Sequence, residues 1–282
     1  MSIVLILLIG GFLAWVGSHG SVEVYGWPLF AACGAMAFLV NWIAFIPAYV
    51  AQTEHYFDLT GTVTYISLIL FAGLVNPEGD LRSLLLAALV ILWALRLGSF
   101  LFRRVKRDGS DGRFDRLKPY WPTFLMVWTL QGLWVFLTLA CALAAMTSSE
   151  VVPLGAFAWV GVGVFFFGWG IEVAADGQKK TFRSDPNNRD RFIETGLWSW
   201  SRHPNYFGEI TLWVGLALVA FPTLYGWRYF VLISPVFVYI LLTRISGIPL
   251  LEERGEKKWG GESAYQAYLE RTSRLLPRPP RR

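Results

Sequence analysis

Residues 28–50 read PLFAACGAMAFLVNWIAFIPAYV and contain no Asp, Glu, Lys or Arg. A helix of about 20 apolar residues is long enough to cross the ~30 Å hydrocarbon core of a bilayer. Further apolar blocks lie at residues 2–16, 84–102, 122–146, 154–173, 206–220 and 229–245, and residues 62–75 form a shorter one. We therefore expect an all-α polytopic bundle with seven membrane-spanning helices, or eight if residues 62–75 also cross.

The composition indicates the same class of protein. The chain has 282 residues, of which 55% are hydrophobic and only 16% are charged, whereas soluble domains carry about a quarter charged residues. Both cysteines, Cys33 and Cys141, fall in apolar segments without a second metal ligand at suitable spacing. We therefore expect no metal site and no disulfide framework, and a single integral membrane domain over residues 1–282.

Lysine and arginine are concentrated in three regions. Residues 103–118 hold seven of the 25, residues 179–202 hold six, and residues 244–282 hold nine. Two apolar blocks separate the first region from the second, and two more separate the second from the third. All three regions are therefore predicted on one side of the membrane, and the positive-inside rule makes that side the cytoplasm.

These basic regions have two interpretations. Either they only set the orientation and contact lipid headgroups, or they also bind a ligand with several phosphate groups, which arginine recognises in bidentate fashion. Acidic residues in the same loops, such as Asp108, Asp185 and Asp190, argue against a simple polybasic lipid tether. The mixed sequence RSDPNNRDRF at residues 183–192 is typical of a loop ordered around a ligand. We therefore favour phosphate binding.

Ionisable residues within apolar segments are costly in lipid and are candidates for function. Arg96 precedes the first basic region, and it either extends to the interface or points inward toward an anion. Glu172, Asp176 and Lys180 are spaced to share one helical face, and they form either an ion-paired helix end or part of a site. Gln131 lies within an apolar block, where its amide needs a hydrogen-bond partner.

Residues 51–65, AQTEHYFDLTGTVTY, are unusually polar for a segment between two apolar blocks. Glu54 and Asp58 are four residues apart and would share a face on a helix. Two neighbouring carboxyl groups do not both ionise easily, so one would have a raised pKa and be suited to hydrogen-bonding or protonating a carbonyl. Alternatively, Asp58 only caps the next helix.

The most informative stretch is WSWSRHPNYFGEITLWVG at residues 198–215. Arg202 and His203 precede a predicted helix whose first position is Pro204, where the missing N–H costs nothing. Asn205 and Glu209 lie one turn apart on the same face of that helix, and Tyr206 also projects from its first turn. A helix N-terminus that carries Arg and His is a good anion site.

RHPNYFGE, the apolar segment after it and the tail SGIPLLEERGEKKWGGESAYQAYLERTSRLLP at residues 246–277 resemble the steroid 5α-reductase superfamily, in particular its bacterial branch. The resemblance runs from about Gln52 to Pro277 and is strongest in the C-terminal third. It implies residues 1–50 as N-terminal spans, residues 51–282 as the reductase core, and residues 170–277 as the cofactor-binding part.

The resemblance also implies an activity, the NADPH-dependent reduction of a C=C bond in a lipophilic enone such as a 4-en-3-one steroid. It assigns cofactor binding to Arg96, Arg107, Asp176, Lys180, Arg183, Arg191, Arg202, His203, Asn205, Tyr206, Glu209 and Tyr265. It places Gln52, Trp93 and Gln131 near the substrate, Trp93 standing where the animal enzymes carry a tyrosine. Glu54, Asp58 and Tyr65 are the candidates for the group that binds the substrate carbonyl.

The RHPxY core is also shared with sterol reductases and with isoprenylcysteine and phospholipid methyltransferases. An S-adenosylmethionine-dependent methyltransferase is therefore the main alternative, and a non-catalytic sterol-binding protein is a second one. S-adenosylmethionine has no phosphate group and needs no arginine cluster, so the charges favour the reductase. We expect a monomer in the bacterial inner membrane with a cytoplasmic C-terminus, lipids and a steroid-like substrate as partners, and no nucleic acid.

Overall fold

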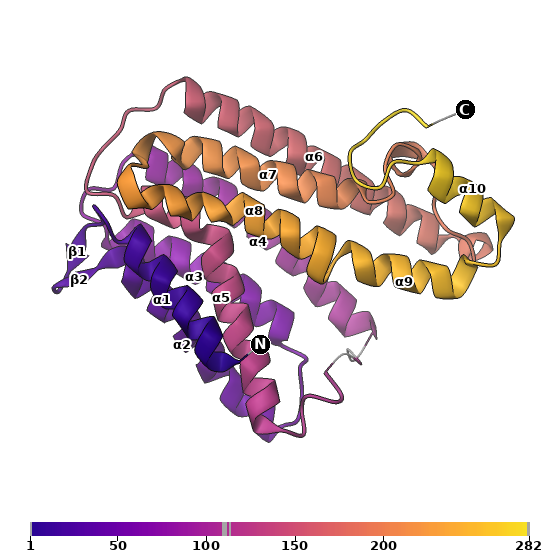
Figure 1. Ribbon diagram of the computed structural model, residues 1–282, viewed down its shortest axis with the longest axis horizontal. Helices are drawn as coiled ribbons and strands as arrows, with labels where there is room; N and C mark the ends of the chain where they lie inside the picture. The colour runs from indigo at the N-terminus through magenta and orange to yellow at the C-terminus, as the bar shows by residue number, and fades with distance from the viewer. Residues whose placement is uncertain (1, 109–111, 113, 281–282) are drawn as a thin grey trace. The chain divides into compact units, whose positions relative to one another are not determined.

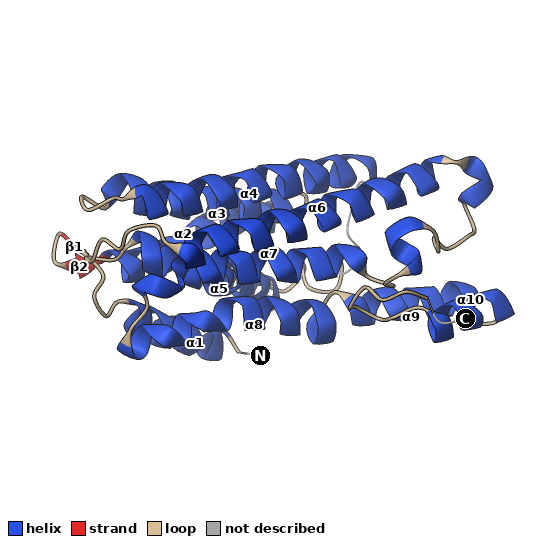
Figure 2. Cartoon of the chain, turned by 90° about the horizontal axis from the view of Figure 1, so that it is seen from above, coloured by secondary structure: helices blue, strands red, loops and turns tan. Residues whose placement is uncertain are grey.

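The structure is a computed structural model that describes residues 2–108, 112 and 114–280, with side chains for residues 2–99, 112 and 114–280. Helices make up most of these residues, and the strands form one short hairpin (Figure 2). Contacts divide the chain into two compact units, the first comprising Met1–Trp159 with Leu216–Ser234 and the second comprising Val160–Gly215 with Pro235–Arg282. The prediction of a single domain stays a prediction.

Seven helical segments among the described residues are long and apolar enough to cross a membrane, namely Leu29–Val50, Phe57–Val75, Leu81–Ser99, Trp121–Met146, Ala156–Ser184, Pro204–Thr223 and Gly226–Trp259. The number of spanning helices agrees with the predicted seven, but the set of segments differs from the predicted one. Phe57–Val75, which the sequence left in doubt, is among them. The opening helix α1 (Ile3–Gly17) is not among them. It has only 15 residues, which is about 22 Å at 1.5 Å per residue.

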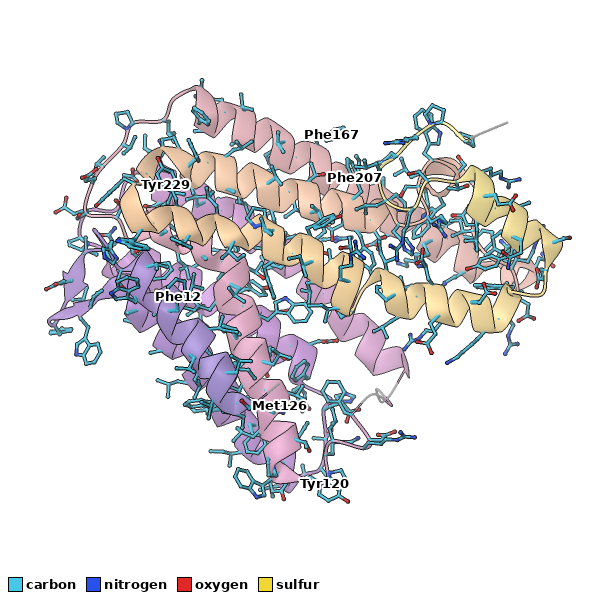
Figure 3. All side chains as sticks on the ribbon, in the orientation of Figure 1. Phe12, Tyr120, Met126, Phe167, Phe207 and Tyr229 are labelled. Atoms are coloured by element: carbon cyan, nitrogen blue, oxygen red, sulfur yellow. The ribbon has the colours of Figure 1, made fainter. Side chains whose placement is uncertain are left out.

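Large apolar side chains are exposed along the helices. Phe12, Phe167 and Tyr229 are examples (Figure 3). Monomeric soluble proteins rarely expose many such residues together, whereas helices that face lipid do. The chain is therefore an all-α integral membrane protein with several spans.

The first unit is built around helix α5 (Trp121–Met146), which packs against α1, α2 (Leu29–Val50) and α3 (Phe57–Val75) (Figure 1). Helix α3 also packs along α4 (Leu81–Asp108). Most residues of α5 from Gln131 onward are buried, as expected for a helix that is apolar on all sides. The hairpin β1 (Glu23–Val24) and β2 (Trp27–Pro28) precedes α2.

Two arginines outside the three basic regions are buried in this unit. Arg228, in η4 (Gly226–Leu232), donates to the carbonyl of Ala144 in the last turn of α5. Arg82, at the start of α4, donates to the carbonyl of Val219 in the last turn of α7 (Pro204–Ala220) and to that of Pro153 at 2.8 Å. The last carbonyls of a helix have no partner within the helix. A cation at this end also interacts favourably with the negative end of the helix dipole. These two arginines therefore have a structural role.

The second unit contains most of α6 (Ala156–Ser184), α7 (Pro204–Ala220) and α8 (Ile233–Ile240), followed by the remaining helices toward the C-terminus. These are the π-helical turn η5 (Leu241–Ile245), α9 (Ile248–Trp259) and α10 (Ser263–Arg271). Short 3₁₀ segments complete the chain at η1 (Pro186–Asn188), η2 (Gly196–Ser199) and η3 (Phe221–Thr223).

Glycines bring α6 and α7 close together. A Cβ atom placed on Gly208 would lie 2.5 Å from the carbonyl oxygen of Gly168, and one on Gly215 would lie 2.7 Å from that of Gly161. On each helix the two glycines are seven residues apart, so they fall on the same face two turns apart. Small residues at such positions let membrane helices pack backbone to backbone. The start of α7, which carries the RHPNY motif, is thereby fixed against α6.

Candidate functional site

A cavity of about 550 Å³ lies in the second unit. Its walls come from the end of α6, residues 188–193, residues 198–203, α9 and α10. The cationic side chains that line it are Lys179, Arg183, Arg189, Arg191, Arg202, Arg254 and Lys258. The carboxylate of Glu252 is the acidic group among the described lining residues. The cavity has the size of a small-molecule site, and its charge suits an anion.

Aromatic rings form part of the cavity wall. The ring centroid of Phe192 lies 5.2 Å from that of Tyr265, 5.3 Å from that of Tyr268 and 5.9 Å from that of Trp259. The Lys258 ammonium lies 5.1 Å from the ring centroid of Trp259. Flat apolar faces beside cations are the two features that bind the rings and the phosphates of a nucleotide.

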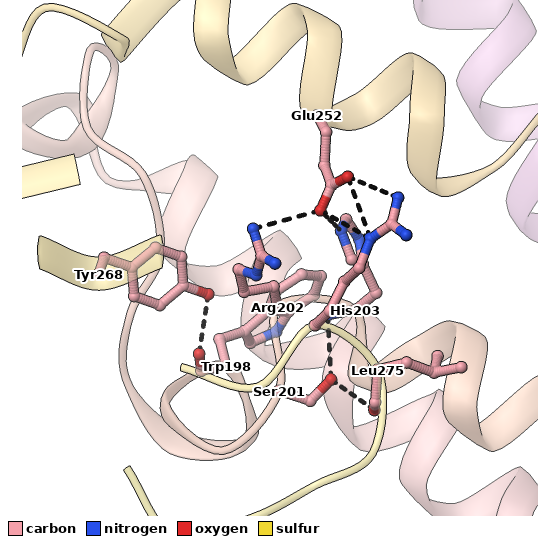
Figure 4. A network of polar contacts seen from close by, with 8 residues as sticks. Trp198, Ser201, Arg202, His203, Glu252, Tyr268 and Leu275 are labelled. Atoms are coloured by element: carbon pink, nitrogen blue, oxygen red, sulfur yellow. Dashed lines mark hydrogen bonds and ion pairs between the residues drawn. The ribbon is translucent and has the colours of Figure 1, made fainter. Parts of the chain in front are cut away.

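Hydrogen bonds hold the segment before α7 in place. The indole of Trp198 donates to the carbonyl of Ala175 on α6 at 3.1 Å, and its own carbonyl accepts the hydroxyl of Tyr268 from α10 at 2.9 Å (Figure 4). The hydroxyl of Ser201 donates to the carbonyl of Leu275 at 2.8 Å, which attaches the C-terminal tail. Arg202 and His203 therefore project from a segment supported by α6, α10 and the tail.

Glu252 lies at the centre of an ion-pair network (Figure 4). Its carboxylate is 3.2 Å from Nη1 of Arg202 and 3.6 Å from Nε2 of His203. Arg274, from the tail, donates from Nη2 at 2.7 Å and from Nε at 3.1 Å to the same carboxylate oxygen. One carboxylate thus links α9, the segment before α7 and the C-terminal tail.

Three buried nitrogens beside this network lack a hydrogen-bond partner among the described residues. They are Nε of Arg202 and both ring nitrogens of His203, Nδ1 and Nε2. Burial lowers the pKa of His203, although Glu252 opposes the shift, so the imidazole is neutral near pH 7. Since leaving a buried polar group without a hydrogen bond is costly, these nitrogens indicate that a polar ligand binds beside them.

The structure brings only some of the predicted cofactor residues to the cavity. Those that line it are Arg183, Arg191, Arg202, His203 and Tyr265. The others in the second unit are not lining residues, namely Asp176, Lys180, Asn205, Tyr206 and Glu209. Two of these residues contact each other: the amide of Asn205 donates to the carboxylate of Asp176 at 3.2 Å. A third, Tyr206, stacks on the lining residue His203 with a distance of 5.9 Å between ring centroids.

The other ionisable residues that the sequence singled out lie elsewhere. Glu172 is buried whereas Lys180 is exposed, so the predicted face of α6 runs from the interior to the surface. Arg96 belongs to the first unit and is partly buried. The side chain of Arg107 lies outside the described residues.

Sequence reasoning did not single out several residues of the cavity. These are Lys179, Arg189, Trp198, Glu252, Arg254, Lys258 and Tyr268. Most are neighbours of predicted residues or belong to the quoted tail motif. The charge of the tail was visible in the sequence, but no spacing rule connects residue 252 with residue 202.

In the first unit, the predicted carbonyl-binding carboxylate is paired with a lysine. Nζ of Lys118 lies 2.7 Å from Oε2 of Glu54, whose side chain is 7% exposed. Glu54 lies in a turn before α3, whose N-cap is Tyr56. The expectation that Glu54 and Asp58 share a helical face is therefore wrong. Asp58 is in the first turn of α3, where a carboxylate favours the helix dipole, and it does not cap the helix.

The other first-unit candidates lie on the helices around α3. Tyr65 is buried, and its ring meets that of Trp93 edge to face at a centroid distance of 5.0 Å. The amide of Gln131 donates to the carbonyl of Phe57 at 2.9 Å, and its Oε1 is buried without a partner among the described residues. Tyr65 and Trp93 are thus neighbours, and their assignment to a substrate site stays a prediction.

Gln52 has a local structural explanation. It follows the last residues of α2 with a φ of 49°, in the left-handed region. Its N–H bonds to the carbonyl of Tyr49, and the N–H of Thr53 bonds to that of Ala48, which is the Schellman pattern that ends a helix. The exposed Gln52 side chain also donates to Tyr49, at 2.8 Å.

Comparisons with known proteins identify a family for this chain, and the description of that family names no activity. A family described as "Protein of unknown function (DUF1295)" matches residues 44–272. An uncharacterized protein of Schizosaccharomyces pombe (strain 972 / ATCC 24843) is 26% identical over 239 residues, covering 74% of this chain and 67% of that protein. No solved structure matches the chain significantly.

Proposed function

The chain belongs to the DUF1295 family, and from that premise we propose that it is an NADPH-dependent reductase of the steroid 5α-reductase type. The reaction is hydride transfer to the C=C bond of a lipophilic enone, with a 4-en-3-one steroid as the expected substrate. The observation that carries the proposal is the cavity of the second unit, whose described lining residues include seven cationic side chains and one carboxylate.

The residues of the cavity fit a nucleotide cofactor. The Nε–H of Arg202 is buried there without a partner in the described part of the chain, and a phosphate oxygen would accept its hydrogen bond. Phe192 and Trp259 offer faces for a base or a nicotinamide ring. NADPH has three phosphate groups, which accounts for the excess of cations, whereas S-adenosylmethionine has none.

The proposed roles follow from this fit. Arg183, Arg191 and Arg202 hold phosphate groups, and the aromatic wall holds a ring of the cofactor. When bound, NADPH supplies the hydride. Asn205, which Asp176 orients through a hydrogen bond, and Glu209 are proposed to contact the reactive end from the first turns of α7.

The carbonyl of the enone needs a hydrogen-bond donor, because negative charge develops on its oxygen as the hydride arrives. Lys118 favours the ionised form of Glu54, and an ionised carboxylate only accepts hydrogen bonds. Tyr65 carries a hydroxyl that donates at neutral pH. Tyr65 is therefore the preferred donor among the three candidates, with Asp58 second and Glu54 in a positioning role.

We further propose that the three basic regions and the C-terminal tail face the cytoplasm of a bacterium, where the cofactor is available. The substrate enters laterally from the lipid of the inner membrane, in which a steroid-like molecule dissolves. The protein works as a monomer in this account.

The test is turnover by the purified protein in detergent, with NADPH and a 4-en-3-one steroid, followed by mass spectrometry of the product. We expect a product two mass units heavier and a higher KM for NADPH in Arg191→Gln, since one phosphate contact is lost. Tyr65→Phe should lower kcat with little effect on NADPH binding. A methylated product with S-adenosylmethionine, and none with NADPH, would replace the reductase with a methyltransferase.

A further inference from the structure

We propose that Glu252 is an internal anion that occupies part of the phosphate site in the ligand-free protein, so that a bound phosphate group competes with it for Arg202. The inference rests on the proposed function for the identity of NADPH, and on the cavity alone for phosphate as the ligand chemistry.

The contacts of Glu252 carry this inference. It is the acidic side chain in a cavity wall with seven cations among the described residues. It pairs with Arg202 and Arg274, and Nε2 of His203 lies 3.6 Å from it. Carboxylate and phosphate oxygens compete for the same guanidinium donors. A phosphate that reaches Arg202 therefore meets a carboxylate already in place.

Exposure makes the exchange feasible. The side chain of Glu252 is 28% exposed, so it lies at the cavity surface and is not sealed within the protein. Arg274 is not among the lining residues, and it offers Glu252 a partner outside the cavity. When phosphate takes Arg202, Glu252 keeps its bidentate pair with Arg274 and releases the arginine that faces the ligand.

The adjacent Glu253 provides a matched control. It has the same chemistry and belongs to the same helix, but its side chain is 59% exposed and pairs with Lys257 at 2.6 Å. It does not line the cavity. Replacing either glutamate by glutamine removes one negative charge from α9, so any general effect of net charge is the same in both variants.

The experiment measures the affinity of Glu252→Gln, Glu253→Gln and the wild type for inorganic pyrophosphate and for NADPH, by calorimetry at fixed ionic strength. Removal of the competing carboxylate should raise the affinity for pyrophosphate by about 5- to 10-fold in Glu252→Gln, the lower range of couplings between sites. Glu253→Gln should bind as the wild type does. The melting temperature of Glu252→Gln without ligand should fall, because Arg202 and Arg274 lose their shared carboxylate partner.

Unchanged or weaker pyrophosphate binding in Glu252→Gln would overturn the inference, and NADPH binding to the wild type in that case would leave the reductase proposal intact. Tighter pyrophosphate binding without any NADPH binding would support the internal anion and remove NADPH as the cofactor. Should Glu252→Gln fail to fold, Glu252→Met makes the same comparison, with the same expected gain in affinity.

Discussion

Replacing Glu54 with glutamine separates a structural role of this carboxylate from a role in proton transfer. Glu54 is 7% exposed and Lys118 is 16% exposed, with 2.7 Å between Nζ and Oε2. Lys118 has a second partner in Asp115 at 3.1 Å, but that carboxylate is 62% exposed. Glutamine keeps the shape of Glu54 and removes the charge, so Lys118 keeps only its solvated partner.

The size of the effect follows from burial. Breaking a buried ion pair by removing one partner costs about 3–5 kcal/mol, whereas an exposed pair contributes about 0–1 kcal/mol. The Glu54–Lys118 pair lies between these limits, and Asp115 compensates in part, so we expect a loss of about 2 kcal/mol. At about 2–4 °C per kcal/mol for a large domain, the melting temperature of Glu54→Gln falls by about 4–8 °C.

The pH dependence of this effect has a defined sign. The hydrogen bond with Glu54 is the main cause that raises the pKa of Lys118 above its ordinary value. A raised pKa in the folded state adds stability that is complete below the ordinary value of about 10.4 and is lost as the pH rises through the raised value. The difference between Glu54→Gln and the wild type is therefore full at neutral pH and shrinks in strongly alkaline buffer, where Lys118 loses its proton.

The assay is a double-mutant cycle of melting temperatures in detergent, with Glu54→Gln, Lys118→Met and the double variant. A direct pair predicts that the double variant loses less stability than the sum of the single variants. Asp115→Asn is the matched control and should change stability by less than about 0.5 kcal/mol. Glu54→Gln with the wild-type melting temperature but no turnover would refute the structural role and make Glu54 a proton donor.

Three further predictions concern packing and pH. Gly208→Ala puts a methyl group against a backbone carbonyl of α6 and should cost about 1–3 kcal/mol, whereas Gly170→Ala, with nothing within 4 Å, should melt at or above the wild-type temperature. Arg228→Ala removes a fully buried guanidinium and leaves the carbonyl of Ala144 without this donor. It should cost about 1–3 kcal/mol, against less than about 0.5 kcal/mol for the exposed Arg244→Ala. Burial lowers the pKa of His203, so the unfolded chain takes up a proton at higher pH than the folded one. Thermal stability should therefore rise with pH up to about 6.5, a trend that His203→Gln should reduce; an equal trend in that variant would exclude His203 as its source.

The spans could be predicted from the sequence because the length and polarity of an apolar block are local properties. Residues 28–50 predicted a spanning helix, and the structure has α2 at Leu29–Val50. Length also explains the difference at the N-terminus, where α1 has only 15 residues. The polar residues 51–56 obscured the start of α3, so the sequence showed only its apolar part.

The candidate site was predicted where one motif carried it and missed where distant segments meet. Arg202 and His203 belong to the RHPNY motif and line the cavity. Glu252, which pairs with both, is about 50 residues away in the chain, and Lys118 is 64 residues from Glu54. Helical spacing rules reach only one or two turns, so neither pairing was visible in the sequence.

The measurement that tests the central claim most directly is a thermal titration of the purified protein with NADPH, NADH and S-adenosylmethionine. A ligand that binds only the folded state at 100 times its Kd adds about 2.7 kcal/mol, or about 5–11 °C at 2–4 °C per kcal/mol. The account predicts this stabilisation with NADPH, much less with NADH, and a reduced shift in Arg202→Gln. Stabilisation by S-adenosylmethionine and none by NADPH would contradict it.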